Sequence, residues 1–365
     1  MANHTITAAL IDCGDLLVRC TRPNRLAAVT RPRRSALSAI NRAGSFRRPW
    51  PGKRPACNAT VSHDAHRRRF KGTDLALRMP AMSKRIERLF ARCREEKRAA
   101  FIPYICGGDP NFARTVEIAQ ALEQAGADLL ELGVPFSDPL ADGIVNQLAS
   151  QRALDNGATV KGVLKCVGQI RSRSEIPIVL YTYLNPLLQY GADAFERDAG
   201  AAGVDGLLIL DLPPEEDRGV GELDCLKQSS SPSSKDENAG QQRLVRIRLV
   251  APTTPPERIA AIAAAARGFI YYVSREGVTG ARDSIAESFE QKLTIIRQHT
   301  GLPIAVGFGI SNPEQAAIVA RVADAVVVGS AIVKLIGKIG DRDDLAGRVG
   351  KFVSPIVSKI RSSRG

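Results

Sequence analysis

Two carboxylates between residues 131 and 143 (ELGVPFSDPLADG) have surroundings typical of catalytic acids and bases. Glu131 interrupts a run of otherwise aliphatic residues that extends from Leu129 to Val134. A carboxylate in such a run is costly to bury unless it is paired or used, and burial should raise its pKa, as suits a general acid or base. Asp142 follows in a loop that contains prolines and glycine. The alternatives are a buried ion-pair partner for Glu131 and an ordinary turn residue for Asp142.

Three glycine-bearing turns in the second half of the chain are typical of a phosphate site. They are SREGVTG at residues 274–280, GFGIS at residues 307–311 and GSAIVK at residues 329–334. Such turns expose backbone N–H groups, and Ser330 can begin a short helix whose positive end faces an anion. Many barrels build a phosphate site from the loops after their last strands. The sequence therefore predicts a phosphorylated substrate with a carboxylate base at its other end.

The segments that must position these residues alternate between short apolar runs and helical patterns from Met82 onward. An amphipathic helix opens this part of the chain, with Ile86, Leu89, Phe90 and Cys93 at helical spacing. The eight apolar runs that follow are residues 101–106, 128–134, 176–183, 206–212, 244–250, 268–274, 303–307 and 325–328. Helical patterns separate most of them, at residues 115–125, 160–171, 256–266, 285–299 and 313–322.

Buried strands that alternate with helices indicate parallel pairing through right-handed crossovers. Eight such units predict an α/β fold, a (β/α)8 TIM barrel over residues 82–365. A doubly wound open sheet is the alternative, which is disfavoured because no Gly-x-Gly-x-x-Gly motif follows the first apolar run. A polar, low-complexity segment at residues 228–242 interrupts the alternation, and we expect a disordered insertion on the face opposite the active site.

The positive charge of the chain is concentrated at its N-terminus. The net charge is +13, and residues 1–81 contain most of the excess of Lys and Arg over Asp and Glu. Clustered arginines and weak hydrophobic periodicity predict a disordered extension there. Three interpretations stay open: an organellar transit peptide, an upstream translation that is not native, and a basic arm that binds RNA or a membrane. No apolar stretch is long enough to span a membrane, so we expect a soluble protein, cytoplasmic or, with a transit peptide, in the plastid stroma.

The cysteines and histidines favour neither a disulfide framework nor a metal site. The seven cysteines form no Cys-x-x-Cys pair. Of the four histidines, only His299 lies beyond the basic segment. We therefore expect reduced thiols, no metal, and acid–base chemistry that is performed by residues other than histidine.

At these motifs the chain resembles the tryptophan synthase alpha subunit family, from about Met82 to about Ser358. ELGVPFSDPLADG carries most of the resemblance, and GVTGAR, GFGIS and GSAIVK follow in the order and spacing of the family. The resemblance implies a TIM barrel and a lyase that cleaves indole-3-glycerol phosphate to indole and glyceraldehyde 3-phosphate. It also implies a function in tryptophan biosynthesis without a cofactor in this chain.

The resemblance further implies roles for single residues. Glu131 matches a catalytic glutamate that moves protons, Asp142 a catalytic aspartate that interacts with the indole N–H, and Tyr271 an active-site tyrosine. Residues that match other positions of the family are Gly280, Gly309, Gly329 and Ser330 for the phosphate, Thr279 for a mobile loop, and Asp211, Tyr183 and Asn185 for the rim and the subunit contact. The chain departs from the family at Ile144 (usually proline), at Asn146 (usually apolar) and at Glu276, an added charge.

The resemblance implies a partner as well. Alpha subunits of this family form an alpha2-beta2 heterotetramer with a beta subunit that carries pyridoxal phosphate and consumes the indole. Residues 135–142 and 185–188 would form part of that contact. Three alternatives remain: a lyase that works alone and releases indole, a silent barrel that only activates a beta subunit, and another phosphate-binding barrel such as a sugar-phosphate epimerase.

Overall fold

The computed structural model describes residues 84–217, 244–273, 282–307 and 309–364. All of them fall within the unit Asp74–Gly365. The basic extension (residues 1–81) and the polar insertion (residues 228–242) that the sequence predicts lie outside the described residues. No described helix has both the length and the apolar character that crossing a membrane requires.

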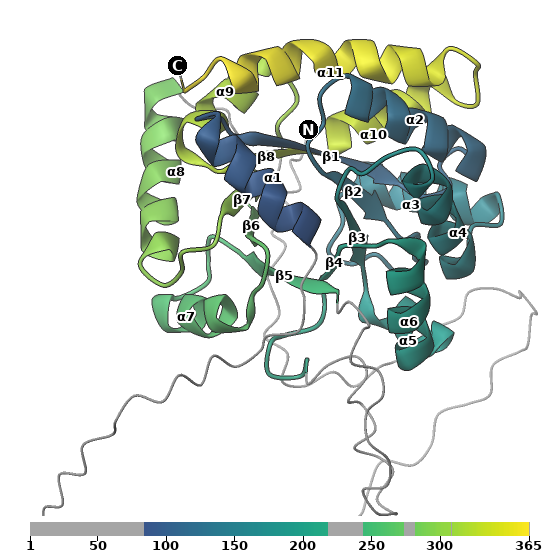
Figure 1. The fold of residues 1–365 in the computed structure, drawn as a ribbon, viewed down its shortest axis with the longest axis horizontal. Coiled ribbons are helices and arrows are strands. Elements are labelled where there is room, and N and C mark those ends of the chain that lie inside the picture. The colour runs from purple at the N-terminus through teal and green to yellow at the C-terminus, as the bar shows by residue number, and fades with distance from the viewer. Residues whose placement is uncertain (1–83, 218–243, 274–281, 308, 365) are drawn as a thin grey trace, which may run out of the picture. The chain divides into compact units, whose positions relative to one another are not determined.

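Eight strands close into a barrel in which each strand pairs in parallel with the next and β8 pairs with β1 (Figure 1). The strands are β1 (Ala100–Cys106), β2 (Leu130–Gly133), β3 (Ile178–Thr182), β4 (Gly206–Ile209), β5 (Val245–Val250), β6 (Ile270–Val273), β7 (Ile304–Gly307) and β8 (Ala325–Val328). The pairing of β8 with β1 excludes an open sheet, so the predicted (β/α)8 barrel is confirmed and the doubly wound alternative is wrong.

Six of the eight strands are shorter than the apolar runs that predict them. Asp128, at the start of the second predicted run, precedes β2. Its carboxylate accepts a hydrogen bond from the Phe101 N–H at 3.0 Å and pairs with the Arg98 guanidinium at 2.7 Å. The fourth run likewise extends to Leu212, whereas β4 ends at Ile209.

Seven helices match patterns that are visible in the sequence. They are α1 (Lys84–Glu95), α2 (Phe112–Gln124), α4 (Val160–Arg171), α7 (Pro256–Ala265), α8 (Arg282–Arg297), α9 (Pro313–Val322) and α10 (Ser330–Ile339). Side-chain caps begin three of them, because Asn111, Thr159 and Asn312 accept hydrogen bonds from N–H groups of the first turn. The buried face of α1 consists of the four residues that the spacing predicts.

Four further helices are not predicted from the sequence: α3 (Ile144–Asp155), α5 (Leu184–Tyr190), α6 (Ala192–Ala202) and α11 (Leu345–Arg361). The buried residues of α3 are the small Ala149, Ser150 and Ala153, so no broad apolar stripe marks it. Pro355 lies inside α11, although proline usually ends a helix.

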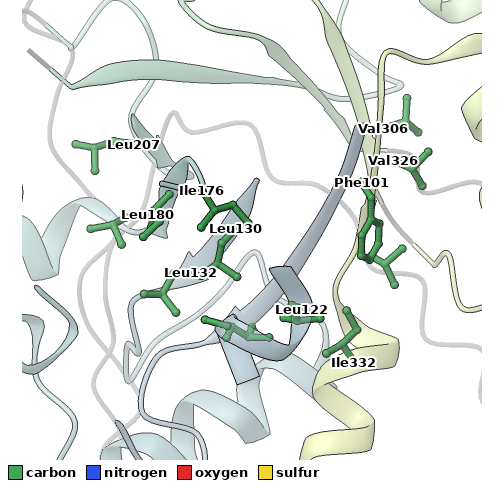
Figure 2. Close-up of a cluster of buried hydrophobic side chains, with 14 of the residues drawn as sticks. Phe101, Leu122, Leu130, Leu132, Ile176, Leu180, Leu207, Val306, Val326 and Ile332 are labelled. Atoms are coloured by element: carbon green, nitrogen blue, oxygen red, sulfur yellow. The ribbon is translucent and has the colours of Figure 1, made fainter. Parts of the chain in front are cut away.

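Most of the apolar core falls into two layers, as the alternation of strand side chains requires, and a smaller third cluster includes Tyr104. The outer layer packs between the strands and the helices and includes Leu130 and Leu132 of β2 (Figure 2). The inner layer fills the barrel and includes Ile102, Leu129 and Val179.

Helix α1 covers one end of the barrel and contributes to the inner layer (Figure 1). The Phe90 ring of α1 lies 5.6 Å from the ring of Phe269, which directly precedes β6. This end is therefore the one at which the strands begin. A binding site on the barrel axis has to open at the other end, where the strands finish.

Candidate active site

Glu131 points into the barrel near the carboxyl ends of the strands. It stands between Leu130 and Leu132, whose side chains belong to the outer layer, so alternation directs its own side chain inward. In the ladder it lies beside Tyr104 of β1 and Val179 of β3. Its exposed fraction is 3 %. A side chain in this inner position can contact a molecule bound inside the barrel.

The Glu131 carboxyl group has no charged partner within the described residues. No hydrogen bond or ion pair from this part of the chain reaches it, so the alternative of a buried ion pair finds no support there. Burial raises the pKa of Glu131 to about 8, and the nearby charge of Asp142 adds to the increase. Glu131 is therefore mainly protonated at neutral pH and is suited to donate a proton.

The buried Glu131 should make stability depend on pH. Its folded-state pKa is raised from 4.5 to about 8, so the stability that its protonated form contributes is fully present below 4.5 and is lost as pH rises through about 8. We expect the unfolding free energy of the protein, measured against that of the Glu131→Gln variant, to fall over this interval. Urea denaturation at about pH 5, 7 and 9 measures it. The same pH dependence in both proteins would contradict the raised pKa.

Three side chains hold the carboxylate of Asp142, which lies in the loop between β2 and α3. The Tyr181 hydroxyl donates to Oδ1 at 2.9 Å, and the Tyr183 hydroxyl donates to Oδ2 at 2.8 Å. The Asn146 amide donates to Oδ1 at 3.3 Å. The Gln147 side chain donates to the backbone oxygen of Asp142 at 2.8 Å. Asp142 lies in a turn, as the alternative of an ordinary turn residue expects, but its side chain is also fixed by three donors, of which Tyr181 packs against the inner layer.

Aromatic rings surround the two carboxylates. Tyr271 of β6 belongs to the inner layer, and burial, followed by the charges of Glu131 and Asp142, raises its pKa well above the usual value. The rings of Tyr104 and Tyr181 meet edge to face with centroids 5.0 Å apart. Tyrosines in these surroundings keep their protons, so they remain hydrogen-bond donors. Tyr271 is among the candidate residues that the sequence suggests, whereas Tyr104 and Tyr181 are not.

Two of these rings lie against strand glycines. The Tyr104 hydroxyl occupies the space that a side chain at Gly133 of β2 would take, and the Tyr271 hydroxyl does the same at Gly307 of β7. The end of the barrel can therefore hold both rings only because these positions lack a Cβ atom. Such glycines within buried strands are a signal that sequence reasoning can use.

The described part of the predicted phosphate site lies at β7 and β8. Gly329 is the N-cap of α10 and Ser330 its first residue, with no side-chain cap, so the first N–H groups of this helix are available to an anion. Gly309 follows β7 with a φ of 70°, a conformation that favours glycine. Gly280, Thr279 and Glu276 lie outside the described residues.

The predicted rim residues lie after β3 and β4. The Tyr183 hydroxyl accepts a hydrogen bond from the Ala141 N–H at 3.0 Å, so it joins the two loops that follow β2 and β3. Asp211 accepts a hydrogen bond from the Leu184 N–H at 2.7 Å and thereby fixes the first turn of α5. Asn185 is exposed on α5. Asp211 thus positions the backbone around the site.

Large apolar side chains are exposed beside these loops. Four of the five most exposed ones in the described residues lie on the loop before α3, on α3 or on α5, namely Leu140, Ile144, Leu148 and Leu188. Leu140 alone is 92 % exposed. Exposed apolar side chains are typical of interaction surfaces where they form a contiguous patch.

The described residues contain no group of three or more His, Cys, Asp or Glu side chains that is arranged to hold a metal ion. Three cysteines of this part of the chain, Cys93, Cys106 and Cys166, are free and buried. Burial raises the pKa of the Cys166 thiol to about 12, so this thiol is unreactive at neutral pH.

Comparisons with known proteins agree with this geometry. The family described as "Tryptophan synthase alpha chain" matches residues 90–353. A tryptophan synthase alpha chain of Opitutus terrae is 50% identical over 275 residues, which cover 75% of this chain and 98% of the relative. That of Citrifermentans bemidjiense is 46% identical over 272 residues, which cover 74% of this chain and 96% of the relative. The crystal structure of tryptophan synthase subunit alpha from Legionella pneumophila is 37% identical, with a TM-score of 0.65, and covers 77% of this chain and 99% of that one.

Proposed function

Because the chain belongs to the tryptophan synthase alpha chain family, we propose that Glu131 and Asp142 are the acid–base pair with which it performs the reaction of that family. The reaction cleaves indole-3-glycerol phosphate to indole and glyceraldehyde 3-phosphate, as a step of tryptophan biosynthesis. The single observation that supports this assignment is that a buried, inward-facing Glu131 with a raised pKa lies near an Asp142 whose carboxylate is held by three donors.

The chemistry needs one group that moves a proton and one that stabilises charge. Indole is a poor leaving group until its C3 atom is protonated, and Glu131 supplies that proton. The positive charge that then develops on the ring nitrogen is offset by Asp142, which accepts the ring N–H. Glu131, now a carboxylate, removes the proton from the glycerol hydroxyl next to C3.

The C–C bond breaks as that hydroxyl becomes the aldehyde, and the electron pair returns to the ring as neutral indole. One proton enters C3 and one leaves the hydroxyl, so Glu131 ends the cycle protonated as it began. Neither an oxidant nor a reductant is needed. Tyr271 lies beside the two carboxylates as a wall and donor for the substrate.

The phosphate group would bind at the other side of the opening. Gly329 and Ser330 offer the N–H groups at the start of α10, and Gly309 contributes the turn after β7. Gly280 and Thr279 complete the set that the resemblance to the family implies. We assign no cofactor to this chain. Pyridoxal phosphate belongs to the proposed partner.

The proposed partner is a beta subunit in an alpha2-beta2 heterotetramer. Support comes from the exposed apolar side chains after β2 and β3, which include Leu140 and Leu188 of the two segments that the sequence analysis assigns to the contact. A surface of this kind next to the opening suits a partner that receives indole directly.

The test is an assay of indole formation from indole-3-glycerol phosphate, with the chain alone and with a beta subunit of the family. We expect turnover in both cases and faster turnover with the partner. A chain that begins at Met82 should match the full chain, because the family match begins at residue 90. Full activity without a partner would indicate a stand-alone lyase, and no activity in either case would indicate a silent barrel.

A pair of substitutions in the same assay tests the partner surface. Leu188→Asp should keep the activity of the chain alone and lose most of the acceleration, since a charge on the apolar contact is costly to desolvate. Ile295→Asp is the matched control, because Ile295 is exposed on α8, away from these loops. Equal acceleration of the two variants would place the contact elsewhere.

A further inference from the structure

We propose that Tyr181 is a positioning residue for Asp142: together with Asn146 it occupies Oδ1 of the carboxylate and leaves Oδ2 to receive the ring N–H of the substrate. This inference rests on the proposed function of Asp142. It concerns two side chains to which the sequence assigns no catalytic role, one of them at a position where the sequence departs from its family.

The Tyr181 ring is itself firmly held. It is the fourth residue of β3, and its backbone pairs with Gly133 of β2 and Leu208 of β4. Its ring meets that of Tyr104 at 5.0 Å and an interplanar angle of 68°. Burial, and then the charge of Asp142, raises the pKa of Tyr181 well above its usual value, so the hydroxyl keeps its proton. A fixed ring with a permanent donor can orient the group that it contacts.

All three side chains of the cluster donate their hydrogen bonds to the Asp142 carboxylate. The Tyr183 hydroxyl accepts from the Ala141 N–H, so its own proton is the one that goes to Oδ2 of Asp142. Tyr181 has Asp142 as its hydrogen-bond partner among the described residues, and its proton goes to Oδ1. The Asn146 amide must present its nitrogen, because the reverse orientation would place two acceptors face to face.

The two oxygens of Asp142 therefore differ. Each carboxylate oxygen offers two lone pairs. Within the described residues Oδ1 receives two donors, from Tyr181 and Asn146, whereas Oδ2 receives one, from Tyr183. The lone pair that remains is on Oδ2, and this is where the ring N–H binds. Without the Tyr181 hydroxyl the carboxylate loses its shorter contact on Oδ1 and is free to rotate away from that orientation.

The test compares two variants that each delete one hydroxyl. Tyr181→Phe removes the donor to Asp142, whereas Tyr190→Phe removes a Tyr–Asp hydrogen bond of 2.8 Å to Asp198, on α5 and α6. We expect Tyr181→Phe to lower kcat about 10-fold to 100-fold, since a hydrogen bond to a charged group is lost and misplacement is costly. KM should change by only about twofold, and the melting temperature should stay close to that of Tyr190→Phe.

A double-mutant cycle separates positioning from a structural effect. In an Asp142→Asn background, measured by single turnover at high enzyme concentration, Tyr181→Phe should cause little further loss, because the group that it positions is already impaired. Independent, multiplicative losses would overturn the inference, as would a Tyr181→Phe enzyme with the kcat of Tyr190→Phe.

Different results would contradict the role of Asp142 and the role of Tyr181. An Asp142→Asn enzyme with full activity would contradict the proposed function itself. An Asp142→Asn enzyme that has lost its activity, beside a fully active Tyr181→Phe enzyme, would leave that function intact and reject only the positioning role.

Discussion

Replacing Glu131 with glutamine is expected to lower the rate of indole formation by about 10²-fold to 10⁴-fold, the usual contribution of a general acid–base residue. The amide has nearly the same shape as the carboxylic acid but cannot donate the proton to C3 or remove one from the glycerol hydroxyl. Because Glu131 is buried with a pKa of about 8, the wild-type side chain is mainly neutral at pH 7, and the neutral amide should preserve the fold.

The measurement is kcat of the variant and the wild type across pH, with the melting temperature as a control for folding. The wild-type rate should decline as pH rises through about 8, where the acid form of Glu131 is lost. A Glu131→Gln enzyme with wild-type turnover would remove this residue from the mechanism.

Replacing Asp142 with asparagine should have a comparable effect for a different reason. The substitution keeps the size of the side chain but removes the negative charge that offsets the charge on the indole nitrogen. Loss of one such electrostatic group commonly costs about 10²-fold to 10³-fold in kcat. The amide also turns a donor toward hydroxyls that donate to Asp142 in the wild type, so Tyr181 and Tyr183 must reorient.

The matched control for this variant is Asp138→Asn, in the same loop. Asp138 is exposed and accepts a hydrogen bond from Ser137, at 2.9 Å. We expect that variant, assayed without a partner, to keep its activity. Equal losses in the two variants would mean that the loop merely tolerates no substitution, and the role of Asp142 would have to be withdrawn.

The barrel and its two carboxylates were predictable because their signals are local. In a parallel barrel each buried strand is a short apolar run in the sequence. The number of such runs, together with the helical patterns between them, therefore predicts the fold. Glu131 is conspicuous because it is a carboxylate between two leucines in such a run, and Asp142 because of the motif around it. These inferences need no knowledge of which strands are neighbours.

The cluster around Asp142 was not predictable in the same way. Tyr181 and Asn146 lie 39 and 4 residues from Asp142 along the chain, and only the pairing of β2 with β3 brings the tyrosine to the carboxylate. The strand that holds Tyr181 reads as an ordinary apolar run. Helix α3 was missed as well, because its buried face consists of small residues rather than large ones.

The glycines against which Tyr104 and Tyr271 pack determine where these two rings lie in the site. Gly133 and Gly307 carry no side chains, and the two phenol groups occupy the volume that results. The space available to a flat bicyclic ring is thus limited in part by the backbone of β2 and β7. A change in the size of the ring that this enzyme accepts should therefore require a substitution at Gly133 or Gly307. An inspection of the polar residues alone would not single out these two positions.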